Sequence, residues 1–308
     1  MRTVFERAPD AHSPRSPIRY LIGVDGGGTG TRLRLADRQG RLLGQGEAGP
    51  SALGQGVEQA WRHVQQALRQ AAAQAGLGDL DLASCAIGLG LSGATVVEQA
   101  RAFAQLQPGY AQGVLDNDGY TTVLGAHGGR PGAVVASGTG AVGEALRADG
   151  SRLLVSGWGW INGDEGSGAW LGLKAMRHAQ QALDGRVPAG ALAQAVWAQA
   201  GRDRETLLAW CAAAGQHGHA QLAPLVFDQA AADPVAQTFV DEAVAELVKL
   251  ALALDPAGQL PLALCGSIAL RLAPLFPAAI RARCVATQGD SAAGALLLIA
   301  SALKEMGL

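Results

Sequence analysis

The sequence predicts an α/β protein in which helices cover both faces of a mixed sheet. Short apolar runs end in glycine-rich segments, as strands do, and longer segments between them carry apolar residues at helical spacing. Over about the first 115 residues the expected order is β-β-β-α-β-α-β, three meandering strands followed by crossover units. The strand–turn–strand segments at 21–35 and 133–146 also indicate a rough internal repeat.

The first half of the chain carries the clearest strand and helix patterns. An apolar run from Leu21 ends at Asp25, a glycine-rich turn follows, and alternating residues around Leu33 begin the next strand. Between 57 and 76, apolar residues recur at steps of three and four, which is typical of one helix face, and Gly76 suits its C′ position. The other elements expected here are a strand from Leu42, a strand at 85–91, a helix at 95–106, a strand at 113–115 and a helix at 119–126.

The second half begins with strands and then becomes largely helical. Strands are expected at 133–136, 142–146 and 153–155, and a polar loop over 157–168 opens a helix at about 169–183. The remaining expected elements are an Ala-rich helical block at 188–255 with breaks near Gly201 and Gly215–Gly218, a strand at 260–264, a helix to about Leu275, a strand at 282–286, and a final helix at 292–304 capped by 289–291.

Composition bounds the class of protein. Apolar residues make up 49% of the chain and charged residues 16%, and 24 basic against 26 acidic residues give a net charge of −2. This balance predicts no nucleic-acid partner and no membrane surface. The four cysteines form no C-x-x-C pair, which favours free thiols in a reducing cytoplasm, and nothing predicts a secretory segment or a membrane span.

The 308 residues suffice for two domains of ordinary size. The Pro-, Arg- and Ser-rich residues 1–17 are expected to form a loose tail, followed by an N-terminal domain at 18–115. A C-terminal domain at 116–308 would carry a helical insertion at about 188–255, which is the candidate surface for a homodimer.

The glycine turn after the first strand has the chemistry of a phosphate site. Glycines let backbone N–H groups approach a phosphate, the hydroxyls of Thr29 and Thr31 add donors, and Asp25 could hold a phosphate-bound Mg²⁺ through water. The run Gly26–Gly30 lacks the Gly-Lys-Ser/Thr of a Walker A loop, and a strand pattern follows it in place of the helix of a dinucleotide fingerprint. A plain hairpin turn is the alternative interpretation.

Other polar loops fall at the ends of later strands, where ligands collect in open α/β sheets. The turn Gly138-Thr139-Gly140 repeats the phosphate-binding pattern, with a simple turn as its alternative. In Asp116-Asn117-Asp118, Asp118 suits the general base of a phosphoryl transfer, and Asp116 could position the metal. The alternative for Asp118 is the N-cap of the helix that follows it.

The loop at 157–168 has side chains that suit a sugar. Carboxylates accept hydrogen bonds from hydroxyl groups and indoles stack on pyranose faces, and the loop offers Trp158, Asn162, Asp164 and Glu165. The alternative for the two carboxylates is a first-turn position that favours the helix dipole. The pair His217 and His219 has no metal-ligand spacing with the cysteines and is expected in a solvated turn.

These motifs together resemble a known family. In order along about residues 20–300, the chain reads D-G-G-G-T-x-T, N-D, S-G-T-G, G-W-G-x-x-x-G-D-E-G-S, L-C-G-S and D-S-A-A-G-A. This series resembles the amino-sugar kinases, N-acetylglucosamine kinases in particular. Their wider family includes the activators of benzoyl-CoA reductase and 2-hydroxyglutaryl-CoA dehydratase, and belongs to the actin-like, ribonuclease H-like ATPases.

The resemblance implies two ribonuclease H-like domains with ATP, Mg²⁺ and an amino sugar in a cleft between them, and a final helix that packs back on the first domain. It implies that Asp118 activates the sugar 6-hydroxyl. The sugar-binding residues would be Trp158, Asp164, Asn117 and Glu165. The ATP-binding residues would be Gly27, Gly28, Thr29, Thr31, Gly138, Thr139, Gly140, Gly266 and Ser267, the last two lying against the nucleoside.

One departure from the family pattern leaves the sugar open. The loop after the third strand often holds a sugar-binding Asn, whereas residues 49–53 read Gly-Pro-Ser-Ala-Leu. N-acetylglucosamine is the first expectation and glucosamine remains open. The rival functions are an activator ATPase, which would need cysteines for a bridging iron–sulfur cluster, and a non-catalytic sugar sensor, which would normally carry a DNA-binding module.

Overall fold

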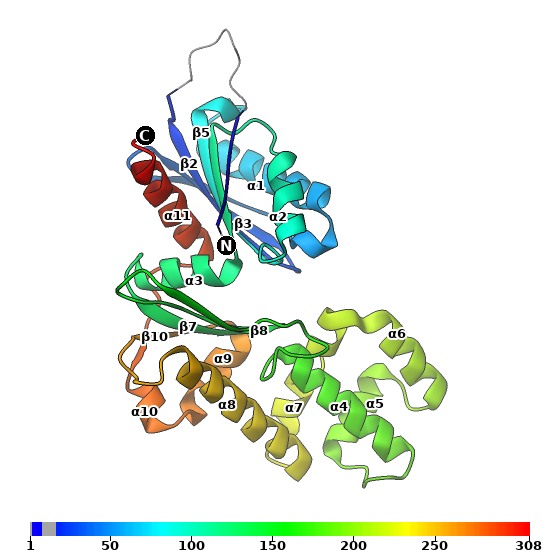
Figure 1. Ribbon diagram of the computed structural model, residues 1–308. Helices are drawn as coiled ribbons and strands as arrows, with labels where there is room; N and C mark the ends of the chain where they lie inside the picture. The colour runs from blue at the N-terminus through cyan, green and yellow to red at the C-terminus, as the bar shows by residue number, and fades with distance from the viewer. Residues whose placement is uncertain (1, 8–16) are drawn as a thin grey trace. The chain divides into compact units, whose positions relative to one another are not determined.

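The computed structural model describes residues 2–7 and 17–308, and its internal contacts separate two units (Figure 1). Unit 1 runs to Pro131 and resumes at Ala286, and unit 2 is Gly132–Val285. The sequence places the boundary after residue 115, whereas the contacts place it after Pro131. The reason is that helix α3 (Asp118–His127) packs against the last helix, α11 (Ser291–Glu305), and both belong to unit 1.

Unit 1 is built on a six-stranded sheet with the order β1-β6-β5-β2-β3-β4. The pairs β2–β5 and β5–β6 are parallel, and the pairs β1–β6, β2–β3 and β3–β4 are antiparallel. The strands are β1 (Thr3–Glu6), β2 (Tyr20–Gly26), β3 (Thr31–Asp37), β4 (Leu42–Ala48), β5 (Cys85–Leu91) and β6 (Gln112–Asp116). The meander of β2, β3 and β4 and the crossovers to β5 and β6 follow the order expected from the sequence.

The first strand corrects the expectation of a loose tail. Thr3–Glu6 pair with Gln112–Leu115 of β6, and Phe5 is buried with its ring edge-on to Trp61 at 6.2 Å. Residues 8–16 of the predicted tail lie outside the described residues. The N-terminus therefore contributes an edge strand and one core side chain to unit 1.

Helices cover both faces of this sheet, as the sequence predicts. Helices α1 (Val57–Gln74) and α2 (Val97–Gln105) lie on one face, and α3 and α11 lie on the other (Figure 1). On the first face the ring of Trp61 stacks on Phe103 at 4.2 Å. On the second, Gly23 and Gly88 leave room for the backbone of α11, because a Cβ on either would meet a helix carbonyl oxygen.

Unit 2 contains a five-stranded sheet with the order β11-β10-β7-β8-β9. Strands β7, β10 and β11 are parallel, and β7–β8 and β8–β9 are antiparallel hairpins. The strands are β7 (Gly132–Ser137), β8 (Ala141–Leu146), β9 (Arg152–Ser156), β10 (Leu262–Cys265) and β11 (Cys284–Val285). The β7–β8 hairpin is the counterpart of β2–β3 in unit 1.

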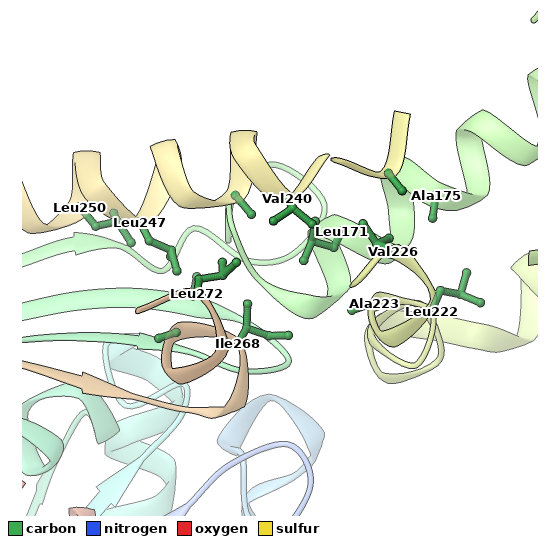
Figure 2. Close-up of a cluster of buried hydrophobic side chains, with 14 of the residues drawn as sticks. Leu171, Ala175, Leu222, Ala223, Val226, Val240, Leu247, Leu250, Ile268 and Leu272 are labelled. Atoms are coloured by element: carbon green, nitrogen blue, oxygen red, sulfur yellow. The ribbon is translucent and has the colours of Figure 1, made fainter. Parts of the chain in front are cut away.

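Helices α4 and α8 pack their apolar faces into one core of unit 2 (Figure 2). Leu171 of α4, Val240 and Leu247 of α8, and Ile268 and Leu272 of α9 are buried there. The helices are α4 (Gly168–Leu183), α5 (Ala191–Ala200), α6 (Arg204–Ala220), α7 (Ala223–Gln229), α8 (Pro234–Leu254), α9 (Ser267–Leu272) and α10 (Ala278–Arg281). Within the described ranges, no helix combines the length and apolarity needed to cross a bilayer.

Candidate active site

The glycine turn of unit 1 connects β2 to β3 and presents backbone groups to solvent. The last pair of the ladder is Gly26 opposite Thr31, and the Gly27 N–H donates to the Gly30 carbonyl at 3.0 Å. Gly28 and Thr29 are exposed, and a Cβ at Gly27 would meet nothing within 4 Å. This open backbone could receive a phosphate.

Thr31 does not belong to that open surface. Its hydroxyl is buried, donates to the Gly49 carbonyl at 2.7 Å and lies 2.7 Å from Ser51 Oγ. The side chain therefore ties the turn to the loop after β4. The sequence suggested that Thr31 could be a phosphate donor, but in the structure its hydroxyl is already engaged within the protein.

Two carboxylates meet beside this turn. Asp25, the penultimate residue of β2, has its pKa raised mainly by burial, while a hydrogen bond from Ser291 and the charge of Arg32 act in the opposite direction. Burial, together with the negative charge of Asp25, raises the pKa of Asp118 to about 6. A carboxylate whose pKa lies near neutrality, at the start of a helix and beside a second carboxylate, is suited to accept a proton.

The structure excludes the N-cap interpretation of Asp118. The N-cap of α3 is Asn117, whose Oδ1 accepts a hydrogen bond from the Tyr120 N–H at 2.6 Å. Asp118 is the first helical residue, so its carboxylate is not used as the cap. Asp116 is fully buried, and its Oδ1 accepts a hydrogen bond from the Asn117 N–H at 2.8 Å. Its carboxylate is therefore engaged inside the protein.

The start of α11 contributes residues that sequence reasoning assigned to helix capping alone. Asp290 is the N-cap and also forms a two-point ion pair with Arg34 of β3, at 3.0 and 2.8 Å. Ser291 is buried, donates to Asp25 and lies 2.8 Å from Thr121 Oγ1 of α3. The Asp-Ser pair before an apolar run signals a cap, and a cap pattern does not reveal these partners.

The turn of unit 2 is held by the N-terminus of α4. The Gly138 N–H donates to the Gly140 carbonyl at 2.9 Å, and the N–H groups of Gly168 and Ala169 donate to the carbonyls of Gly138 and Thr139 at 2.8 and 3.1 Å. A Cβ at Gly138 would meet nothing within 4 Å. This turn therefore also presents open backbone. It is held by hydrogen bonds from the first residues of α4, whereas the turn of unit 1 is held by the loop after β4.

Gly266 and Ser267 lie beside this turn. Both are exposed at the end of β10, where α9 begins. Gly266 has φ +85°, and a Cβ there would overlap the Ser137 carbonyl group. Only glycine allows this approach of the two segments without strain. The structure thus brings together the turn at 138–140 and the Gly266–Ser267 pair predicted from the sequence.

The loop at 157–168 divides into an exposed and a buried part. Trp158 is 82% exposed, and Asn162 is also exposed. Asp164 is 6% exposed and accepts hydrogen bonds from the backbone N–H groups of Ala141 and Gly159. Burial raises its pKa despite these donors, and the charge of Glu165 adds to the effect. The carboxylate of Asp164 therefore anchors the loop from inside.

His219 corrects the expectation of a solvated turn. Its ring is buried between Trp160 at 5.3 Å and Trp210 at 5.2 Å, whereas His217 is exposed. Nothing in the H-x-H pattern distinguishes the two. The difference comes from the path of α6, which turns one ring inward.

The described residues contain no group of three His, Cys, Asp or Glu side chains placed to hold a metal ion. Magnesium in nucleotide sites is usually held by one or two carboxylates plus the phosphates, and so does not need such a group. Asp25 and Asp118 interact electrostatically strongly enough to raise the pKa of Asp118. This pair of carboxylates fits a divalent cation that arrives with a nucleotide.

Two α/β units, each with a glycine-rich β-turn-β, have the architecture expected of the actin-like ATPase fold. A crystal structure from Chromobacterium violaceum, provisionally named an N-acetylglucosamine kinase, is 49% identical, covers 92% of this chain and 99% of its own, and has a TM-score of 0.89. The model of the BadF/BadG/BcrA/BcrD ATPase family matches residues 22–297, and the chain belongs to this family.

Relatives with assigned activities are similar over different lengths. The glucosamine kinase of Vibrio cholerae is 34% identical over 281 residues, which is 91% of this chain and 95% of the relative. An N-acetylmuramic acid/N-acetylglucosamine kinase of Clostridium acetobutylicum is 32% identical over 175 residues, 55% of this chain and 56% of the relative. The names of these relatives agree on an amino sugar and differ in which one.

Proposed function

We propose that this protein is an ATP-dependent amino-sugar kinase that transfers the γ-phosphoryl group of ATP to the 6-hydroxyl of glucosamine or N-acetylglucosamine. The observation that carries the proposal is the carboxylate of Asp118, which is free of a capping role and has a pKa raised to about 6 beside Asp25. The named relatives support the kinase class.

The proposed reaction forms a bond between the sugar O6 and the γ-phosphorus while the bond from that phosphorus to the β,γ-bridging oxygen breaks. Asp118 accepts the proton of the sugar hydroxyl, and ADP leaves with the bridging oxygen. At pH 7 a carboxylate with a pKa of about 6 is mostly ionised, yet it is a stronger base than an ordinary aspartate. Asp118 is therefore largely in the ionised form that can accept a proton, and it binds that proton more strongly than an ordinary aspartate does.

Each unit has its own candidate phosphate-binding turn. In unit 1, Gly28 and Thr29 are exposed and would offer N–H groups and a hydroxyl, whereas Gly27, whose N–H donates to the Gly30 carbonyl, would offer space for the phosphate. In unit 2, Thr139 and Gly140 would offer the donors, and Gly138, whose N–H donates to the Gly140 carbonyl, would offer space. Gly266 and Ser267, exposed beside the second turn, would lie against the nucleoside. A magnesium ion, when bound with ATP, would neutralise phosphate charge, and Asp25 would hold it through water.

In unit 2, the candidate sugar-binding groups lie in the loop at 157–168. Trp158 offers an exposed indole face for the pyranose, and Asp164 and Glu165 offer carboxylate oxygens. The main chain of the loop is ordered by the buried Asp164, so this residue would act on the sugar with a fixed orientation. The amide of Asn117 would add a contact next to Asp118.

The environment proposed for the protein is the cytoplasm, because all four cysteines are free, as expected in a reducing compartment. The homodimer through the helical block at 188–255 stays a prediction. Light scattering of the purified chain measures the mass directly.

The decisive experiment is release of ADP from Mg·ATP with a panel of glucosamine, N-acetylglucosamine, N-acetylmannosamine, glucose and no sugar. We expect release with one amino sugar, and Asp118→Asn should lower kcat by about 10³-fold while its melting temperature at pH 7 is no lower than that of the wild type, because a buried carboxylate with a raised pKa is replaced by a neutral amide. Release that ignores every sugar would indicate an activator-type ATPase. Sugar binding without release would indicate a sensor.

A further inference from the structure

Helix α6 contains a break in its backbone, and the residues after the break contact the loop at 157–168. Gly215 has φ +54° and ψ −163°, a conformation available almost exclusively to glycine, in the middle of an otherwise helical segment. A Cβ at this position would meet nothing within 4 Å, so the glycine is required by the backbone path and not by crowding. The break redirects the residues that follow it, Gln216–Ala220.

The first residue after the break reaches the sugar-binding loop proposed above. Gln216 Nε2 donates to Asp164 Oδ2 at 3.3 Å, and both atoms lie beside Gly140, where a Cβ would be 2.7 Å from Asp164 Oδ2 and 3.3 Å from Gln216 Nε2. The carboxylate therefore accepts from three different segments, through Ala141, Gly159 and Gln216. Of these, Gln216 supplies the side-chain donor.

Asp164 needs such support because its own backbone is unfavourable. It has φ +55°, in the left-handed region that a residue with a Cβ adopts at a cost, and its side chain is 6% exposed. Its carbonyl accepts from the Ser167 N–H at 3.0 Å, which closes the turn into α4. The loop conformation is therefore maintained by its contacts with neighbouring segments.

A second contact from the same segment reaches the same loop. The ring of His219 lies against Trp160, and its Nδ1 is 2.7 Å from the Gly215 carbonyl oxygen at the break. The backbone of His219 in turn packs on Gly172 of α4, where a Cβ would overlap its carbonyl group. Gln216 and His219 thus contact the loop from one fixed base.

We propose that the segment Gln216–His219 is a clamp for the loop at 157–164, and that Gln216 is a positioning residue that fixes the Asp164 carboxylate for sugar binding. This proposal rests on the amino-sugar kinase function proposed above for its kinetic part. The ordering of the loop by the clamp is a property of unit 2 and does not depend on turnover.

The test uses three variants of the full chain. Gln216→Met keeps the length of the side chain and removes the donor, and Gln216→Glu puts a second carboxylate against Asp164. Gln221→Met is the matched control, because Gln221, the C-cap of α6, is an exposed glutamine just after this segment, and its amide contacts His217 and not the loop at 157–164. Each variant is measured for KM of the sugar, KM of ATP, kcat, and hydrogen–deuterium exchange of residues 157–164 without ligand.

We expect Gln216→Met to raise the KM of the sugar about tenfold, with the KM of ATP unchanged and kcat within about threefold. Gln216→Glu should have the larger effect because of the repulsion between carboxylates. Backbone amides at 157–164 should exchange faster in both variants and at the wild-type rate in Gln221→Met.

Two results would overturn the clamp. One is wild-type exchange at 157–164 in both Gln216 variants, and the other is an equal rise in the KM of sugar and ATP. If no sugar supports turnover in the wild type, the kinase proposal fails while the exchange rates still decide whether Gln216 orders the loop.

Discussion

The two glycine turns share a hydrogen-bonding pattern and differ in what surrounds them. In unit 1 the Gly27 N–H donates to the Gly30 carbonyl, and in unit 2 the Gly138 N–H donates to the Gly140 carbonyl. The unit 1 turn is held by the loop after β4, through the N–H groups of Ser51 and Ala52 on the Gly27 carbonyl. The unit 2 turn is held by the N-terminus of α4.

The side chains near the end of the first strand differ between the two hairpins. In unit 1 this region carries Asp25, whose carboxylate interacts with Asp118. In unit 2 it carries Ser137, whose buried hydroxyl donates to the Gly166 carbonyl at 2.9 Å. The turn is thus repeated in both units, whereas the two carboxylates for which we propose a role in the chemistry belong to unit 1.

The largest expected difference comes from exchanging these strand-end side chains. Asp25→Asn should lower kcat about 10²-fold, because charge stabilisation at the phosphates is lost. Ser137→Ala should leave kcat within about threefold and cost about 1–2 kcal/mol of unfolding free energy, because the Gly166 carbonyl loses its donor. Steady-state kinetics and denaturant unfolding measure both, and comparable losses of kcat would contradict the assignment of chemistry to unit 1.

The pH dependence should follow the same asymmetry. Since Asp118 must be ionised to accept a proton, kcat/KM for the sugar should fall about tenfold per pH unit below about pH 6, and this limb should be absent in Asp118→Asn. The raised pKa favours the protonated form in the folded state. Its stabilising contribution is present below pH 3.8 and is lost as the pH rises through about 6. Urea unfolding without ligand, at pH 4 and pH 7, should show a larger loss in the wild type than in Asp118→Asn, in which the raised pKa of Asp25 still contributes.

A matched pair of alanines compares the turns directly. A Cβ added at Gly27 or at Gly138 would have no neighbouring atom within 4 Å. Gly27→Ala and Gly138→Ala should therefore change the free energy of unfolding by less than about 0.5 kcal/mol. Each should raise the KM of ATP about tenfold if the added methyl group occupies phosphate space. A rise in one variant alone would assign the phosphates to one turn, and no rise in either would remove both from the site.

The smallest effect is expected at the start of α11. Ser291→Ala removes the hydroxyl that donates to Asp25 and lies against Thr121, and should cost about 1 kcal/mol of unfolding free energy. Ser301→Ala, at an exposed position on the same helix, is the control. Equal stability of the two variants would show that the buried hydroxyl pair contributes nothing measurable.

Elements defined by local pattern were predictable from the sequence. The all-apolar run at 85–91 is strand β5 with the expected limits, and the spacing at 57–76 gives α1 with Gly76 at φ +68° after its end. Strand β1 was missed because four residues without alternation become a strand only by pairing with β6, far along the chain. Pairing of this kind leaves little local signal.

The same limit applies to the candidate site. Polar residues at strand ends predicted Asp25 and Asp118 in unit 1 and one turn in each unit, because the ends of neighbouring parallel strands lie at one edge of their own sheet. The contacts of Gln216 with Asp164 and of Ser291 with Asp25 join elements that no sequence spacing relates. They depend on a backbone break in one case and on a helix crossing in the other.

The return of α11 to unit 1 determines when each unit can be completed during synthesis. Unit 2 is continuous in sequence, so all of its strands are available once residue 285 has left the ribosome. Unit 1 lacks the helix that covers Gly23 and Gly88 until the last residues are made. Unit 1 begins first during translation and is therefore completed last. Until α11 is made, one face of its sheet stays exposed to solvent or covered by a chaperone while unit 2 is synthesised.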